Sequence, residues 1–289
     1  MLKQRVLSAI VMLVVAIVAL FWLPPLLFTL ALTAIVVLGM WEWAQFAGFK
    51  RPIARALVAF VAFGVLIFPM MASSHYIQAA RFLTDETTPL LFVGGIWWLI
   101  AIVLVVSYPK SSTWWSKSIV AKFIFGFSTL IPFLIGVLAL RFYHYHLDAY
   151  QGTYLLLYVF LLVWAADTGA YFVGRALGKH KLAPKVSPGK SWEGAIGGVM
   201  TSAIIATLFL NVTPENVFGR ELATLPFIVL STVTVAISII GDLTESMFKR
   251  QAGIKDSSNL IPGHGGILDR IDSLTAAVPV FAIGFFFLL

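Results

Sequence analysis

The chain of 289 residues is 60% hydrophobic and only 11% charged, whereas soluble proteins carry about 25% charged residues. Its mean hydropathy of +0.94 indicates an integral membrane protein, and the absence of cysteine excludes disulfides and thiolate metal sites. The net charge of +7 does not indicate nucleic-acid binding, because the basic residues lie in short loops between apolar runs.

Nine apolar runs are long enough to cross the bilayer as helices, which takes about 20 residues each. The sequence therefore predicts an all-α, polytopic membrane protein with a single membrane domain, 1–289. Spans one to five occupy 1–150, and spans six to nine, expected to be catalytic, occupy 151–289. Pro24 and Pro25 separate the first two spans. The predicted spans cover about 6–22, 24–41, 55–72, 90–108, 121–140, 153–174, 194–211, 224–241 and 271–289.

The distribution of basic residues predicts the orientation of these spans. With the N-terminus in the cytoplasm, nine spans leave only Arg81, Arg141 and Arg220 of the 20 lysines and arginines on the outer side. This bias agrees with the positive-inside rule. We therefore expect a cytoplasmic N-terminus and an outer C-terminus. The cytoplasmic loops 174–193 and 242–271 then lie on the same side.

The segment from Asp167 to Gly194 is the first candidate for chemistry. Asp167 lies inside the sixth span, where a carboxylate is costly and marks a function or a paired charge. Prolines and glycines after it favour a shaped loop, whose lysines and backbone amides would suit a polyphosphate. The alternative is that these lysines only hold the loop in the cytoplasm. In the following span, the Gly194-x-x-x-Gly198 pair is compatible with a close helix contact.

The polar stretch from Ser246 to Asp272 is the second candidate. Asp242 ends the eighth span just before it, and Asp269 and Asp272 stand three residues apart at the start of the ninth, so they share one helix face. Carboxylates without cysteine suit a hard cation such as Mg²⁺, which Asp242, Asp269 and Asp272 could hold together. His264, between glycines, could be a ligand, an acid–base group or a turn residue.

These two segments resemble the phosphatidate cytidylyltransferases, also called CDP-diacylglycerol synthases. The resemblance rests on Ser246-x-Phe248-Lys249-Arg250, Lys255-Asp256 and the run from Pro262-x-His264-Gly265-Gly266 to Asp269-Arg270-Ile271-Asp272. Asp167-Thr168-x-Ala170-Tyr171 and Ser187-Pro188-x-Lys190-Ser191-x-Glu193-Gly194 also match. The likeness is close over about 160–272, and the chain as a whole is most similar to the proteobacterial inner-membrane members.

The resemblance implies that CTP and phosphatidic acid react to CDP-diacylglycerol and pyrophosphate at the cytoplasmic face of a bacterial inner membrane. It implies Mg²⁺ on Asp242, Asp269 and Asp272. It also implies two cations per site, of which the second could be a monovalent ion. The implied catalytic group also includes Lys249, Arg250 and His264, of which Lys249 and Arg250 would contact phosphate. The implied contacts to the phosphates of CTP or the lipid are Asp167, Ser187, Pro188, Lys190, Glu193, Lys255, Asp256, Gly265, Gly266 and Arg270.

Other activities remain open at this point. A CTP-dependent lipid kinase would attack the γ-phosphorus instead of the α-phosphorus, and a cation-coupled transporter would also use acids within its spans. A transporter is disfavoured because the acids cluster on one side of the membrane. The sequence leaves open the acyl-chain preference, CTP against dCTP, and whether the chain forms a homodimer.

Overall fold

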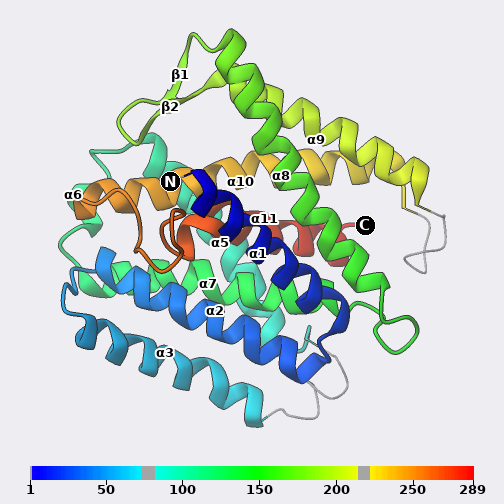
Figure 1. The fold of residues 1–289 in the computed structure, drawn as a ribbon, viewed down its shortest axis with the longest axis horizontal. Helices are drawn as coiled ribbons and strands as arrows, with labels where there is room; N and C mark the ends of the chain where they lie inside the picture. The colour runs from blue at the N-terminus through cyan, green and yellow to red at the C-terminus, as the bar shows by residue number, and fades with distance from the viewer. Residues whose placement is uncertain (1, 73–81, 214–221) are drawn as a thin grey trace.

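The structure, a computed structural model, describes residues 2–72, 82–213 and 222–289, with side chains from residue 6 onward and without those of 67–72. Long helices dominate it (Figure 1). The N-terminal part contains α1 (Leu2–Trp22), α2 (Pro25–Phe46), α3 (Pro52–Ala72), α5 (Thr87–Val106), the single turn α6 (Ser112–Trp115) and α7 (Ile119–Arg141). The C-terminal part contains α8 (Gln151–Leu177), β1 (Lys181–Ala183), β2 (Ser187–Ser191), α9 (Trp192–Val212), α10 (Thr224–Ala252) and α11 (Leu268–Phe287).

The long helices arise where apolar runs are free of helix breakers. α1 ends at Trp22, and α2 begins at Pro25 with proline in its first turn, where a missing N–H costs nothing. The predicted break at the two prolines is therefore confirmed. Among the described residues, seven helices are long and apolar enough to cross a membrane, and Val6–Trp22 and Pro52–Leu66 form shorter apolar helices. The polytopic helical architecture is thus confirmed.

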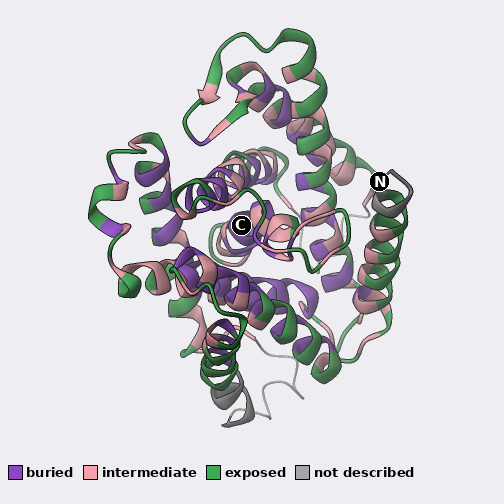
Figure 2. Cartoon of the chain, turned by 60° about the vertical axis from the view of Figure 1, so that its left-hand side comes forward, coloured by how far each residue is buried: buried purple, intermediate pink, exposed green. Residues whose placement is uncertain are grey.

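The centre of the bundle is formed by α7, α10 and α11. α11 packs against α10, α7 and α5, and α8 packs along α9. Figure 2 shows buried residues concentrated in this centre, while exposed residues cover much of α1 and the hairpin. The exposed residues of α1 and α9 include many large apolar side chains, among them Ile10, Val14, Ile196, Ile204 and Leu208. Such surfaces are stable against lipid and unfavourable in water.

A β-hairpin interrupts the helices, which the all-α prediction did not include. β1 and β2 pair antiparallel, with Lys181 opposite Ser191 and Ala183 opposite Ser187. The predicted shaped loop is therefore a two-stranded ribbon. Pro188 is tolerated in β2 because both strands of a two-stranded sheet are edges. The hairpin stands at one end of the molecule, beyond the end of α8 (Figure 1).

α10 is longer than its predicted span of 224–241. It continues to Ala252, so the predicted loop 242–271 is helical over its first part. The helix stops at Gly253, whose φ of +70° favours glycine and lets its N–H reach the carbonyl of Arg250. Asp242, Glu245 and Lys249 consequently lie on one face of α10, spaced by three and four residues.

Candidate active site

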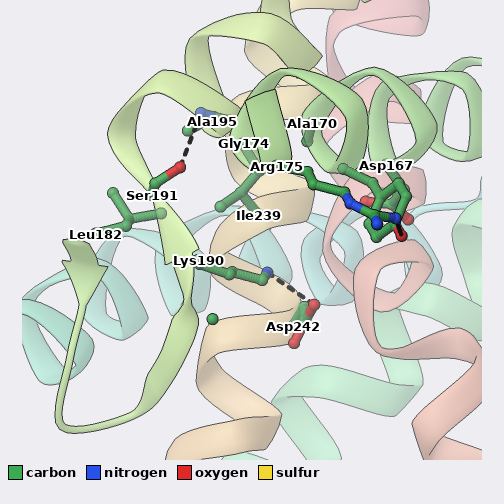
Figure 3. A pocket seen from close by; sticks show the side chains of 13 residues that line it. Asp167, Ala170, Gly174, Arg175, Leu182, Lys190, Ser191, Ala195, Ile239 and Asp242 are labelled. Carbon is green, nitrogen blue, oxygen red and sulfur yellow. Dashed lines mark hydrogen bonds and ion pairs between the residues drawn. The ribbon is translucent and has the colours of Figure 1, made fainter. Parts of the chain in front are cut away.

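The first candidate segment and Asp242, which lies just before the second, line one cavity of about 400 Å³ at the hairpin end of the bundle (Figure 3). Asp167 comes from α8, Lys190 from β2 and Asp242 from α10. Arg175, near the end of α8, also lines it, and its guanidinium donates to the hydroxyl of Tyr171 at 2.9 Å. The cavity therefore gathers two acids and two bases from three separate elements.

Two of the charges in this cavity form an ion pair. The Lys190 ammonium lies 2.7 Å from an Oδ atom of Asp242, and both side chains are about 30% exposed, at 27% and 30%. Asp167 lies within electrostatic range of Lys190 and Asp242, and so does Asp272. A polyanion entering here would meet the exposed Arg175 as well as Lys190, and binding to Lys190 would displace part of its pairing with Asp242.

Close helix packing holds the hairpin over the cavity. A Cβ on Gly194 would lie 2.9 Å from the carbonyl oxygen of Ala170, and one on Gly198 would lie 2.9 Å from that of Ala166. The close helix contact expected for this glycine pair is therefore confirmed, between α9 and α8. Ser191 caps α9 by accepting from the Gly194 N–H at 3.2 Å.

Polar side chains hold the hairpin at both of its ends, just before β1 and at the turn between the strands. Glu193 accepts from the backbone N–H of His180, and its Oε1 lies 2.6 Å from the His180 Nδ1. Arg250 donates to the carbonyl oxygen of Val186 at 3.3 Å. Glu193 and Arg250, both predicted to act on substrate, thus hold β1, β2 and α10 in place in this structure.

Lys249 lies in a second, buried cluster. Its ammonium is 2.8 Å from Glu245 and 2.6 Å from Asp269, and these three side chains are 10% exposed or less. In the sequence interpretation Lys249 is a phosphate contact, but here its charge is neutralised by two buried carboxylates. Such an arrangement compensates the cost of burying each charge singly.

Asp269 is surrounded by donors from the loop before α11. Besides Lys249 at its Oδ1, its Oδ2 accepts from the Ser257 N–H at 2.9 Å and from the Gly266 N–H at 2.8 Å. Gly265 has a φ of +80°, and a Cβ there would lie 2.6 Å from Asp269. The two glycines of the sequence motif therefore allow the loop to wrap closely around this carboxylate.

The remaining predicted residues lie around this loop. His264 has its Nδ1 2.7 Å from the Ser8 hydroxyl, so α1 contacts the glycine-rich turn. Lys255 and Asp256 are exposed and line a separate polar cavity of about 480 Å³ beside Arg55 of α3. Arg270 is exposed on the first turn of α11. These residues do not line the cavity of Lys190 and Asp242.

Glu42 is a residue that the sequence interpretation missed. It lies on α2, is fully buried, and accepts hydrogen bonds from the same loop that surrounds Asp269. The sequence did contain a signal for Glu42. A carboxylate in an apolar run is costly and marks a function or a paired charge, and this rule had already identified Asp167.

The acids can be tested for a fit to a hard cation. Asp242 and Asp272 lie within electrostatic range of each other, and oxygen-only carboxylates suit Mg²⁺. Asp269 fits less well, since Lys249 and the N–H groups of Ser257 and Gly266 all donate to it. Asp242 is engaged less fully, by its ion pair with Lys190 and a 3.3 Å hydrogen bond from the Ser246 hydroxyl. Within the described residues, no three of the His, Asp and Glu side chains are arranged to hold a metal ion. The fit is thus to a site with two protein carboxylates, completed by other oxygens.

An apolar groove of about 670 Å³ adjoins the charged cavity. Its walls come from α5, the hairpin, α9 and α10, and Leu182, Ala195 and Ile239 line both spaces. Along α9 it extends from Trp192 to Met200, about 12 Å of helix at about 1.5 Å per residue. The two spaces together form a site with a charged end and an apolar end.

Comparison with known proteins adds to this geometry. A model of the cytidylyltransferase family matches residues 3–288. A phosphatidate cytidylyltransferase of Haemophilus influenzae is 56% identical over 290 residues, covering 100% of both chains. One of Pseudomonas aeruginosa is 45% identical, covering 98% of this chain and 96% of its own. One of Bacillus subtilis is 41% identical over 162 residues, covering 53% of this chain and 55% of its own.

Proposed function

Because the chain belongs to the cytidylyltransferase family and is a nucleotidyltransferase, we propose that it transfers the cytidylyl group of CTP to phosphatidic acid. The products are CDP-diacylglycerol and pyrophosphate. Relatives of 56% and 45% identity along nearly their whole length carry the name phosphatidate cytidylyltransferase. This chain would supply CDP-diacylglycerol for phospholipid synthesis.

The observation that carries this proposal is the continuity of the charged cavity with the apolar groove. Phosphatidic acid is an anion on two acyl chains, so it needs cationic and apolar surfaces side by side. Lys190 and Arg175 supply the first, and the groove between α5, α9 and α10 supplies the second. A lipid phosphate bound near Lys190 would have its acyl chain directed along α9 into the apolar layer.

The protein needs to do little to activate the attacking group in this reaction. An oxygen of the lipid phosphate is already a nucleophile; it attacks the α-phosphorus of CTP, and the bond from that phosphorus to the bridging oxygen of pyrophosphate breaks. The protein must hold two polyanions together in line and neutralise the charge that develops on pyrophosphate. In this proposal Lys190 and Arg175 perform this task, and the Asp242 carboxylate orients Lys190 through their ion pair.

A magnesium ion fits the same site as part of the proposal. Asp242 and Asp272 would hold it, since Mg²⁺ commonly takes one or two carboxylates together with substrate phosphate oxygens. When bound, it would neutralise phosphate charge beside the reacting phosphorus. Asp269, predicted as a third ligand, would have to give up its hydrogen bonds to Lys249, Ser257 and Gly266 to join them.

The membrane topology belongs to the proposal too. We place nine spans in a bacterial inner membrane, with the N-terminus and the catalytic hairpin in the cytoplasm and the C-terminus outside. The lack of cysteine allows a direct test. A cysteine in place of Lys3 should react with a membrane-impermeant maleimide only in inside-out vesicles, and one in place of Leu289 only in right-side-out vesicles. Labelling of both from one side would refute the odd number of spans.

The activity is tested with purified protein, phosphatidic acid and CTP labelled with ³²P at the α-phosphorus. Cytidylyl transfer puts the label into the lipid and depends on added Mg²⁺. A CTP-dependent lipid kinase would leave all label in CDP, and a transporter would consume no CTP. Either of these two results would overturn the proposal.

A further inference from the structure

Glu42 is a fully buried carboxylate far from the proposed site in the sequence. It lies near the end of α2, whose other buried residues are mostly apolar. None of the ion pairs within the described residues includes it. Arg55 lies within electrostatic range but uses its hydrogen bonds on the Trp41 carbonyl and the Gln45 side chain. A buried carboxylate without an ion pair must be stabilised by other donors.

Those donors all come from the segment between α10 and α11 and from the first residue of α11. The Ser258 hydroxyl donates to Oε1 at 2.6 Å, the Ile267 N–H to Oε1 at 2.9 Å and the Leu268 N–H to Oε2 at 2.7 Å. The last two are N–H groups at the start of α11, where a helix lacks partners of its own and favours negative charge. Glu42 therefore caps α11 from another helix.

Gly266 shows how closely the loop fits this carboxylate. A Cβ on Gly266 would lie 2.3 Å from the Glu42 Oε1 and 2.1 Å from the Ser257 hydroxyl oxygen. Atoms cannot approach this closely, and the atoms in the way are buried. The glycine of the sequence motif is thus required by the Glu42 side chain lying against it.

Ser257 links Glu42 to the acid cluster. Its hydroxyl lies 3.1 Å from the Glu42 Oε2 and 2.8 Å from the Asp269 Oδ2, and its single proton can serve one of them at a time. The Lys249 ammonium donates hydrogen bonds to both Asp269 and Glu245. A connected polar network therefore runs from α2 through the loop to α10.

We propose that Glu42 is a positioning residue for the transfer reaction: it fixes the loop 257–268 and the start of α11, and thereby the orientation of Asp269 and Asp272. This inference rests on the proposed function for its catalytic consequence. Its structural part does not, because the loop contacts are properties of the free protein. It assigns the N-terminal helices a direct part in shaping the site, where the sequence interpretation placed catalysis in 151–289.

If Glu42 only stabilised the fold, its replacement would affect kcat no more than another replacement that costs the same stability. The test makes this comparison. Glu42→Gln keeps the size of the side chain but turns an acceptor into an NH₂ group facing N–H donors. Val36→Ala, also fully buried on α2, removes apolar volume from a side chain that cannot hydrogen-bond to the loop and serves as the matched control for lost stability. Both proteins are compared in detergent for thermal unfolding, for kcat and KM with CTP, and for deuterium exchange of loop amides without substrate.

The positioning role predicts that Glu42→Gln lowers kcat by about ten- to a hundredfold, the size usual for residues that orient a catalytic group. KM should change much less, and exchange at Ile267 and Leu268 should accelerate. Val36→Ala should lower the unfolding temperature but leave kcat and loop exchange near their original values. Adding Ser257→Ala to Glu42→Gln should cost less than the two single losses combined, because both break one network.

Three results would overturn the inference. One is wild-type kcat in Glu42→Gln, and another is unchanged exchange at Ile267 and Leu268. The third is an equal loss of kcat in Val36→Ala at an equal drop in unfolding temperature. If the protein does not transfer cytidylyl groups at all, neither variant nor the wild type gives a measurable kcat. Deuterium exchange of the loop amides still tests the contacts of Glu42. Failure of the function and failure of the inference are therefore distinguishable.

Discussion

Replacing Lys249 with methionine separates a buried structural cation from a substrate contact. Lys249→Met keeps the length and the apolar stem of the side chain but removes the ammonium that lies 2.8 Å from Glu245 and 2.6 Å from Asp269. The two carboxylates, 5% and 6% exposed, then lack their compensating charge. Removing one partner of a buried ion pair typically costs about 3–5 kcal/mol. Two orphaned carboxylates place this variant at the upper end of that range.

The measurement is unfolding in detergent at neutral pH, followed by tryptophan fluorescence. For a chain of this size, a loss of about 5 kcal/mol corresponds to a drop of roughly 10–20 °C in unfolding temperature. Lys181→Met, an exposed lysine on β1, is the control and should stay within about 0.5 kcal/mol of the wild type. Glu245→Gln added to Lys249→Met should recover part of the loss, because it removes one uncompensated charge.

The reasoning fails if Lys249→Met unfolds within about 1 kcal/mol of the wild type, the range of an exposed ion pair. That outcome, combined with a large loss of activity, would support the role inferred from the sequence motif, a lysine that binds phosphate. Equal unfolding temperatures for the single and double variants would also contradict the ion-pair account.

Three further predictions concern the cavity, the groove and the loop. Lys190→Gln should lower kcat/KM by at least about tenfold, because it removes a charged hydrogen bond to the substrate. Lys179→Gln, which is exposed and outside the cavity, should change kcat/KM little. Initial rates at varied CTP and lipid concentrations measure both effects. Ala236→Trp, which fills the groove, should raise KM for long-chain phosphatidic acid and not for a short-chain form, and equal effects on both would remove the groove from the lipid site. Gly266→Ala should lower the unfolding temperature and the activity, because its Cβ has no room, whereas Gly64→Ala, on α3, meets nothing within 4 Å and should be neutral in both assays.

Local signals in the sequence account for much of the molecule. Apolar runs of the necessary length predicted the membrane helices, and the proline pair predicted the break between α1 and α2. The glycine pair in α9 was compatible with a close helix contact, which the structure shows to be with α8. These properties depend on neighbouring residues and on the thickness of a bilayer, so a single chain is enough to infer them.

Segment ends and strand pairing were harder to infer. The hairpin of β1 and β2 was predicted only as a shaped loop, because each strand is too short to show a period. The extension of α10 to Ala252 was missed because its last turns are charged. The end of an apolar run shows where a chain leaves the apolar layer, but it does not show where the helix ends. Hydrogen bonds continue through polar residues until Gly253 ends them.

The partners of charged groups were decided by the tertiary structure alone. The sequence identified Lys190, Asp242, Lys249 and Asp269 as residues that matter, because charge in an apolar chain is costly, and the motif they belong to indicated the family. It could not show that Lys190 pairs with Asp242 while Lys249 is buried between Glu245 and Asp269. Nor could it link Glu42 to a loop more than 200 residues away. Burial and hydrogen bonding depend on which helices meet, and that information exists only in the folded chain.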